Sequence, residues 1–115
     1  MKHILTVVVL LLLGRPDGVL SFEQESLGLG RVRHKSRTEV VFRFSNNGEK
    51  PIVITGAETA CGCTKVDFSS KPVMEGCSDS LTVRFHAIDK GAFYKKITLT
   101  TTGGRHTIAI KGVVE

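Results

Sequence analysis

Three cysteines carry the most distinctive chemistry of this chain: Cys61 and Cys63, which flank Gly62, and Cys77 further along. A cysteine sulfur can form a disulfide, react as a nucleophilic thiolate or bind a soft metal ion. In an oxidising compartment, three cysteines cannot all pair within one copy of the chain. At least one sulfur must therefore be free, shared with another chain or bound to a ligand.

Several states of these cysteines are compatible with the sequence. A bond from Cys61 or Cys63 to Cys77 would close a loop of about 15 residues and stabilise the domain by roughly 3 kcal/mol. Residues two apart in an extended strand share a face but lie too far apart for the Cβ separation of about 3.8 Å that a disulfide needs. Cys61 and Cys63 could therefore bond to each other only if the chain bends sharply at Gly62. The remaining alternative is a cysteine that packs as a small buried apolar residue.

A thiol-dependent function is the alternative that these residues suggest. Cys61 and Cys63 could capture Cu(I) or Zn(II), with Cys77, Met74 or His86 completing the ligand set, or they could act as a redox partner. A structural zinc site typically shows two ligand pairs at regular spacing, whereas this chain has a single Cys-x-Cys pair. We therefore expect no resident cofactor and keep the Cu or Zn carrier or redox partner as the alternative function.

A short basic segment is the second candidate site. Arg31, Arg33, Lys35 and Arg37 alternate along it, and an extended chain would place them on one face. We expect the first hairpin turn in the same segment. The predicted role is an anion contact, for example with a lipid phosphate or an acidic polysaccharide. The alternative is a solvated edge whose charge discourages the addition of another strand.

The charge balance favours anionic partners. The chain has 16 Lys and Arg against 11 Asp and Glu, a net charge of +5, which attracts anions without selecting one. Nucleic acid is disfavoured because no aromatic residues interleave with the basic segment. We expect an envelope protein or an anionic glycan or lipid surface as the partner.

The N-terminus has the pattern of an export signal. Lys2 and His3 precede an apolar run from Ile4 to Leu13, which has the length of a signal-peptide core and about half the length of a membrane-spanning helix. Cleavage is predicted before Phe22. The sequence therefore predicts a signal peptide over 1–21 and one exported domain over 22–115, in the periplasm, secreted or on the cell surface, with no transmembrane segment after the signal is removed.

The remaining residues predict an all-β fold. Apolar residues alternate with polar ones, and Gly, Pro and Asn interrupt the alternation at short intervals, which is typical of an immunoglobulin-like antiparallel β-sandwich of about seven strands. Asn46-Asn47-Gly48 predicts a turn, and Gly103-Gly104 predicts a two-residue hairpin loop between two antiparallel strands. The inward residues of the predicted strands are Val40, Phe42, Phe44, Ile52, Ile54, Leu81, Val83, Phe85, Ile97, Leu99, Ile108 and Ile110.

A change of phase near Gly56 predicts a β-bulge. Continuing the inward register of Ile52 and Ile54 would bury Glu58, whereas a slip of one residue at Gly56 would instead turn Ala57, Thr59 and Cys61 inward. A glycine accommodates such a bulge at low cost.

Taken together, these segments resemble a bacterial family of domains of unknown function with a Cys-Gly-Cys-Thr signature, itself similar to the immunoglobulin-like ASH, MSP and Hydin-type domains. The matching segments are residues 42–48, Pro51-Ile52-Val53-Ile54, Cys61-Gly62-Cys63-Thr64, Gly91-Ala92-Phe93, residues 96–99 and residues 110–113. The resemblance implies an immunoglobulin-like fold and an envelope location but no activity. Cys77 is extra to the family pattern, so nothing that the family implies about paired cysteines extends to it.

An enzyme is disfavoured by the motifs. The sequence has no nucleophile elbow, no phosphate-binding glycine loop and no Cys-x-x-Cys redox motif. We therefore predict a non-enzymatic, exported binding or structural module of a bacterial cell envelope.

Overall fold

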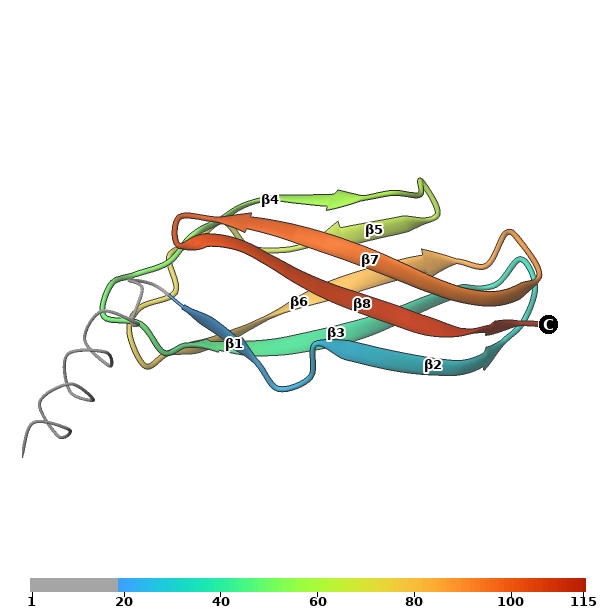
Figure 1. The fold of residues 1–115 in the computed structure, drawn as a ribbon, viewed down its shortest axis with the longest axis horizontal. Helices are drawn as coiled ribbons and strands as arrows, with labels where there is room; N and C mark the ends of the chain where they lie inside the picture. Colours follow the sequence, from blue (N-terminus) through green and yellow to red (C-terminus); the bar gives the residue numbers. More distant parts are fainter. Residues whose placement is uncertain (1–18) are drawn as a thin grey trace, which may run out of the picture.

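The computed structural model describes residues 19–115, which form two four-stranded sheets packed face to face (Figure 1). One sheet has the order β1-β3-β6-β5 and the other the order β2-β8-β7-β4. The strands are β1 (Leu20–Phe22), β2 (Ser26–Val32), β3 (Arg37–Asn46), β4 (Ile54–Thr59), β5 (Thr64–Asp67), β6 (Ser78–His86), β7 (Gly91–Thr101) and β8 (Gly104–Val114). The all-β, immunoglobulin-like sandwich is confirmed.

The structure has eight strands among its described residues rather than about seven because the N-terminal strand is divided between the sheets. β1 pairs with β3 in antiparallel fashion, and after three residues the chain continues as β2, which pairs with β8 in parallel. The other pairings are antiparallel, including the predicted one between β7 and β8. One parallel edge strand is therefore added to an otherwise antiparallel fold.

Alternating side chains from both sheets fill the interior, as predicted. Because successive residues of a strand point to opposite faces, each long strand contributes every second side chain to the core. Val40 is only partly buried. The other predicted inward residues are all buried: Phe42, Phe44, Ile52, Ile54, Leu81, Val83, Phe85, Ile97, Leu99, Ile108 and Ile110. Their burial supplies the main stabilisation of the sandwich.

The predicted bulge and turns are present, with one correction. The register shifts between Ile54 and Gly56, and Glu58 is exposed while Ala57 is partly buried. The β7–β8 loop lies one residue earlier than predicted, because Thr101 pairs with Gly104. Gly104 has a φ of 119°, so the glycine ends the turn rather than occupying its centre.

The start of the described chain is part of the fold. Leu20 is buried and pairs with Asn46, and the backbone N–H of Asn47 donates to the carbonyl of Val19 at 2.9 Å. Cleavage before Phe22 would therefore divide β1. Residues 1–18 of the predicted signal peptide lie outside the described residues. Residues 19–115 contain no helical segment that could span a lipid bilayer.

Asn46 explains the turn that follows β3. Its side chain is buried and donates to the carbonyls of Lys50 at 2.8 Å and Val73 at 2.9 Å, while its Oδ1 accepts from the N–H of Gly48 at 2.9 Å. A buried amide with both donors and its acceptor satisfied holds the backbone of this turn in place. Asn46 therefore joins the β3–β4 turn to the segment before β6.

Asn46→Asp should destabilise the protein by roughly 2 to 4 kcal/mol, because it replaces two buried donors with a carboxylate that faces two carbonyls. Urea denaturation would measure the change. Asn47→Asp is the matched control, since Asn47 is exposed, and it should change stability by less than about 0.5 kcal/mol. Equal effects at the two positions would contradict this role for Asn46.

Candidate thiol and anion site

Cys61 and Cys63 lie in the crossover between β4 and β5, which are edge strands of different sheets. The two cysteines form a disulfide with their Cα atoms 5.2 Å apart. The Thr59 hydroxyl donates to the carbonyls of Cys61 and Thr64, both at 3.1 Å, and the Thr64 N–H donates back to Cys61 at 3.2 Å. The chain bends at Gly62, and of the alternatives that the sequence left open, the disulfide between Cys61 and Cys63 is the one observed.

Cys77 is a free, exposed thiol at the opposite end of β6. It immediately precedes Ser78, whereas the carbonyl of Cys63 accepts from His86 at the last residue of that strand. At about 3.3 Å per residue, the ends of this segment lie roughly 30 Å apart. A bond from Cys61 or Cys63 to Cys77, one of the alternatives that the sequence left open, is therefore not the one observed.

The proposed metal ligands are separated in the same way. Met74 is grouped with Cys77, because the Cys77 N–H donates to the Met74 carbonyl at 3.0 Å across a turn in which Gly76 has a φ of 74°. His86 lies beside Cys63 instead. Within residues 19–115 no three His, Cys, Asp or Glu side chains are grouped so that they could hold a metal ion.

The basic segment is divided between the two sheets. Arg31 is in β2, where it lies 3.4 Å from Glu115, and Arg37 begins β3 in the other sheet. Between them, Lys35 has a φ of 66° and Ser36 donates its N–H to the Arg33 carbonyl at 3.1 Å. The predicted hairpin is therefore a crossover between sheets, and Arg31, Arg33, Lys35 and Arg37 do not share one face. Whether any of these side chains contacts an anion stays a prediction.

A hollow of about 420 Å³ brings one member of each predicted site together. It lies where β3 and β5 begin and β6 ends, and the β4–β5 crossover contributes Gly62 and Cys63 to its lining. Cys63 and Arg37, which the sequence predicted for different sites, both line it. The complete lining is Arg37, Thr38, Glu39, Gly62, Cys63, Lys65, Arg84, Phe85 and His86.

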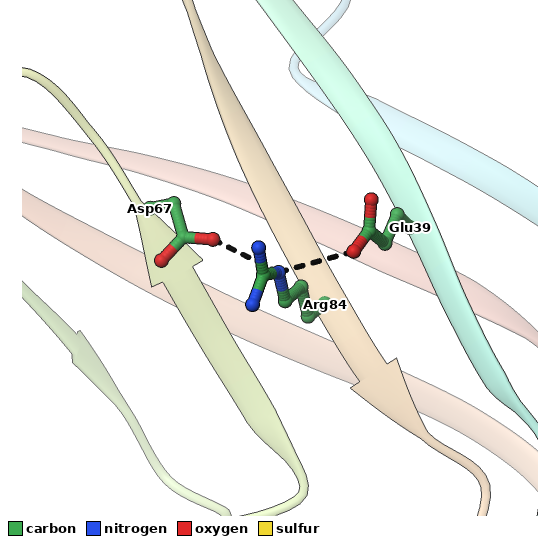
Figure 2. Close-up of polar contacts among 3 residues, drawn as sticks. All are labelled: Glu39, Asp67 and Arg84. Atoms are coloured by element: carbon green, nitrogen blue, oxygen red, sulfur yellow. Dashed lines mark ion pairs between the residues drawn. The ribbon is translucent and has the colours of Figure 1, made fainter.

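Charge is unevenly compensated in this hollow. Figure 2 shows the Arg84 guanidinium between two carboxylates, with its Nε 3.1 Å from Glu39 and 2.9 Å from Asp67. Among the described residues, Arg37 and Lys65 make no ion pair. Arg84 is thus held in place in a trio of net charge −1, and the cations Arg37 and Lys65, which also line the hollow, bring the whole group to a net charge of +1.

Lys65, Arg84 and Glu39 were not predicted as site residues. The alternation in β6 does place Arg84 and His86 on the polar face of their strand, as expected. Their neighbours depend on the register, in which Arg84 lies opposite Glu39 on one side and Lys65 on the other. A single sequence contains no signal for that register.

The family model described as "Protein of unknown function (DUF1573)" matches residues 20–114. The chain belongs to this family. A comparison with curated protein sequences found no match. The family match begins at β1, in agreement with the burial of Leu20. That Cys-Gly-Cys-Thr is the signature of the family stays a prediction.

Solved structures similar to this member of DUF1573 share its fold at low sequence identity. A protein of unknown function from Porphyromonas gingivalis W83 has a TM-score of 0.73 at 14% identity, over 85% of this chain and 47% of that protein. The chain therefore spans about half of that relative. The ASH/PapD-like domain 7 of human CEP192 has a TM-score of 0.69 at 6% identity, over 84% of each chain.

A further match is WR4, an MSP family member from C. elegans, with a TM-score of 0.59 at 7% identity, over 84% of this chain and 97% of that one. The expected similarity to ASH and MSP domains is thus confirmed at the level of fold. At these identities the likeness establishes the architecture, and function has to be argued from the residues.

Alkylation of the native protein without reductant should label Cys77 alone, because Cys61 and Cys63 are bonded to each other. Mass spectrometry of the iodoacetamide-treated protein should show one added label before reduction and three after reduction and denaturation. Cys77→Ser should abolish the first label. A label on Cys61 or Cys63 before reduction would contradict the disulfide.

Proposed function

We propose that this DUF1573 protein is a non-enzymatic binding module of a bacterial cell envelope, and that it holds an anionic group of its partner in the hollow beside Cys63. The observation that supports this most directly is that Arg37 and Lys65 line the hollow without an ion-pair partner and together outweigh the surplus negative charge of Glu39 and Asp67 around Arg84. A carboxylate or phosphate could accept from both side chains without displacing an existing ion pair.

The strands that carry these residues favour a preformed site. Arg37 and Glu39 are on β3, Arg84 is on β6, and Lys65 and Asp67 are on β5, three neighbouring strands of one sheet. The backbone ladder fixes where each of these side chains starts, so that binding has to order the side chains but not the backbone. Since the interior is filled with apolar side chains, we place recognition on the outer surface of the sandwich.

The disulfide supports the envelope location. Disulfides persist in oxidising compartments such as the periplasm and the cell exterior and are rare in the cytosol. The apolar run at residues 4–13 has the pattern of an export signal. Both observations agree with export, which we include in the proposal.

Arg37→Ser and Lys65→Ser should each weaken binding to anionic probes about two- to fivefold, as expected for solvent-accessible charge pairs. The probes are polygalacturonate and, separately, vesicles of phosphatidylglycerol, which distinguish a carboxylate polymer from a lipid phosphate. Retention on immobilised probe at low and moderate salt would be measured. Arg105→Ser is the matched control, because Arg105 is an exposed cation on the other sheet, and it should retain binding. Equal losses for all three variants would indicate general charge attraction and contradict the assignment to the hollow.

A thiol-dependent redox partner is the second candidate, and the disulfide between Cys61 and Cys63 favours it over a metal carrier. A bonded pair has no thiolate to offer a metal ion. In thiol–disulfide exchange, two thiols of a partner would become a disulfide, while Cys61 and Cys63 would gain two electrons and two protons and become thiols. A metal carrier would first require this reduction.

The two candidates differ in the effect of replacing both cysteines. For a binding module, Cys61→Ser with Cys63→Ser should lower stability in urea while leaving retention on the anionic probes within about twofold, because the cations remain. For a redox partner, the folded double variant should lose all exchange with a reduced dithiol peptide. Loss of probe binding without loss of folding would contradict the binding module as proposed.

A further inference from the structure

The outer edge of β3 is open along half of its length. β1 pairs only with Phe44, Ser45 and Asn46, after which the chain leaves this sheet and continues as β2 against β8. Figure 1 shows the chain turning away between β1 and β2. The stretch from Arg37 to Val41 therefore has β6 on one side and, within residues 19–115, no strand on the other.

The hydrogen bonds at the end of this edge show which backbone groups it presents. The Arg43 carbonyl accepts from Glu23 at 3.0 Å, and the Asn47 N–H donates to Val19 at 2.9 Å, both on the side away from β6. In an antiparallel strand alternate residues direct both backbone groups to the same side. The groups left facing outward without a strand partner are thus the N–H and C=O of three residues, Arg37, Glu39 and Val41.

The other edges of the sandwich have features that hinder the addition of a strand. β4 has a bulge at Gly56, and β2 has a register shift between Gly28 and Arg31. β1 has three residues and β5 has four. β3, in contrast, pairs with β6 without a register shift from Arg37 to Ser45, so its open stretch is regular and continuous.

Apolar side chains line the same side of the sandwich. Leu27, Leu29 and Val40 pack against the core but are only partly buried. A strand added beside β3 would direct alternate side chains toward them, and apolar residues at those positions would cover this remaining surface.

We propose that the open edge of β3 binds an extended segment of another protein, which adds to the sheet as a further strand. The segment would match about five residues, roughly 17 Å of strand, with apolar side chains at the positions facing Leu27, Leu29 and Val40. The affinity for this segment comes from backbone hydrogen bonds to β3, and the specificity comes from the segment's apolar side chains at alternate positions. This inference goes beyond the proposed function, because it uses the backbone of β3 rather than the side chains of the hollow.

A second copy of the chain is a poor occupant of this edge. The two-fold antiparallel pairing that uses all three outward-facing residues centres on Glu39, which places Glu39 opposite Glu39 of the other copy, whereas pairings centred on Thr38 or Val40 use only two of the three. Like charges directly opposite each other are unfavourable. A pairing centred on Val41 would need Arg43, whose carbonyl is already bonded to Glu23.

The test uses the whole domain and a capped, fluorescent peptide of sequence Thr-Val-Thr-Leu-Thr-Val-Thr. Binding is measured by anisotropy, and amide hydrogen exchange is measured with and without peptide. The peptide should bind saturably and slow the exchange of the Arg37, Glu39 and Val41 amides. Two N-methylated forms of the peptide are compared, one methylated on the backbone nitrogens of its threonines and the other on those of its apolar residues. One of these two forms should bind at least tenfold more weakly than the unmodified peptide.

Val41→Pro removes an N–H that faces the open edge and should weaken peptide binding about tenfold. Val41→Thr keeps that N–H and should retain binding. Lys65→Ser should leave peptide binding unchanged while it weakens retention on anionic probes, so that the failure of one proposal is distinguishable from the failure of the other.

Three results would overturn the inference. The first is that both N-methylated peptides bind as well as the unmodified peptide. The second is that saturating peptide does not protect the three amides, a result that the exchange data give even if Val41→Pro fails to fold. The third is that the free protein forms a dimer in sedimentation equilibrium, and that Val41→Pro, but not Val41→Thr, converts this dimer to monomer. That result would assign the edge to a second copy.

Discussion

The pairing of β3 with β6, unbroken from Arg37 to Ser45, is the interaction on which the rest of the structure depends. Its inward residues, Phe42 and Val83 among them, form the centre of the core. Its outward residues place Glu39 opposite Arg84, and so fix the floor of the hollow. Because one face of each strand must be buried, a slip of one residue would expose the phenylalanines and bury the charges. The same burial that stabilises the sandwich therefore also positions its candidate site.

The division of the first strand between two sheets has two opposite consequences. It gives β8 a parallel neighbour and completes one sheet, and it leaves the other sheet with a partly uncovered edge strand. The remaining edges are short or interrupted by bulges, which natural β-proteins use to prevent association. A sandwich of this size could have extended β1 along β3 instead. Because β1 ends early, we propose a protein partner at this edge. The anion that we propose for the neighbouring hollow makes a second site, with different chemistry, on the same sheet.

Local patterns in the sequence were sufficient for much of the fold. The alternation of Phe42 and Phe44 with Val41 and Arg43 predicts a strand with one dry face, because the geometry that it reflects has a period of two residues. The bulge at Gly56 followed from the conflict between Ile54 and Glu58, since burying a carboxylate without a partner is costly. These features depend on residues a few positions apart. The hairpin loop before Arg105 was displaced by one residue, because Gly103 and Gly104 allow either position and only the pairing of β7 with β8 selects between them.

The sequence by itself determined the immunoglobulin-like sandwich, its buried residues and the distinctive sulfur chemistry at Cys61 and Cys63. The tertiary structure alone decided which sulfurs meet, since Cys77 is separated from the other two by the length of β6. It also separated Arg31 from Arg37, brought Arg37 to Cys63 and Lys65, and left part of β3 without a neighbour. The physical reason is that these outcomes depend on the register and order of strands far apart in the chain. Alternation shows which face a side chain takes, but not which strand will lie beside it.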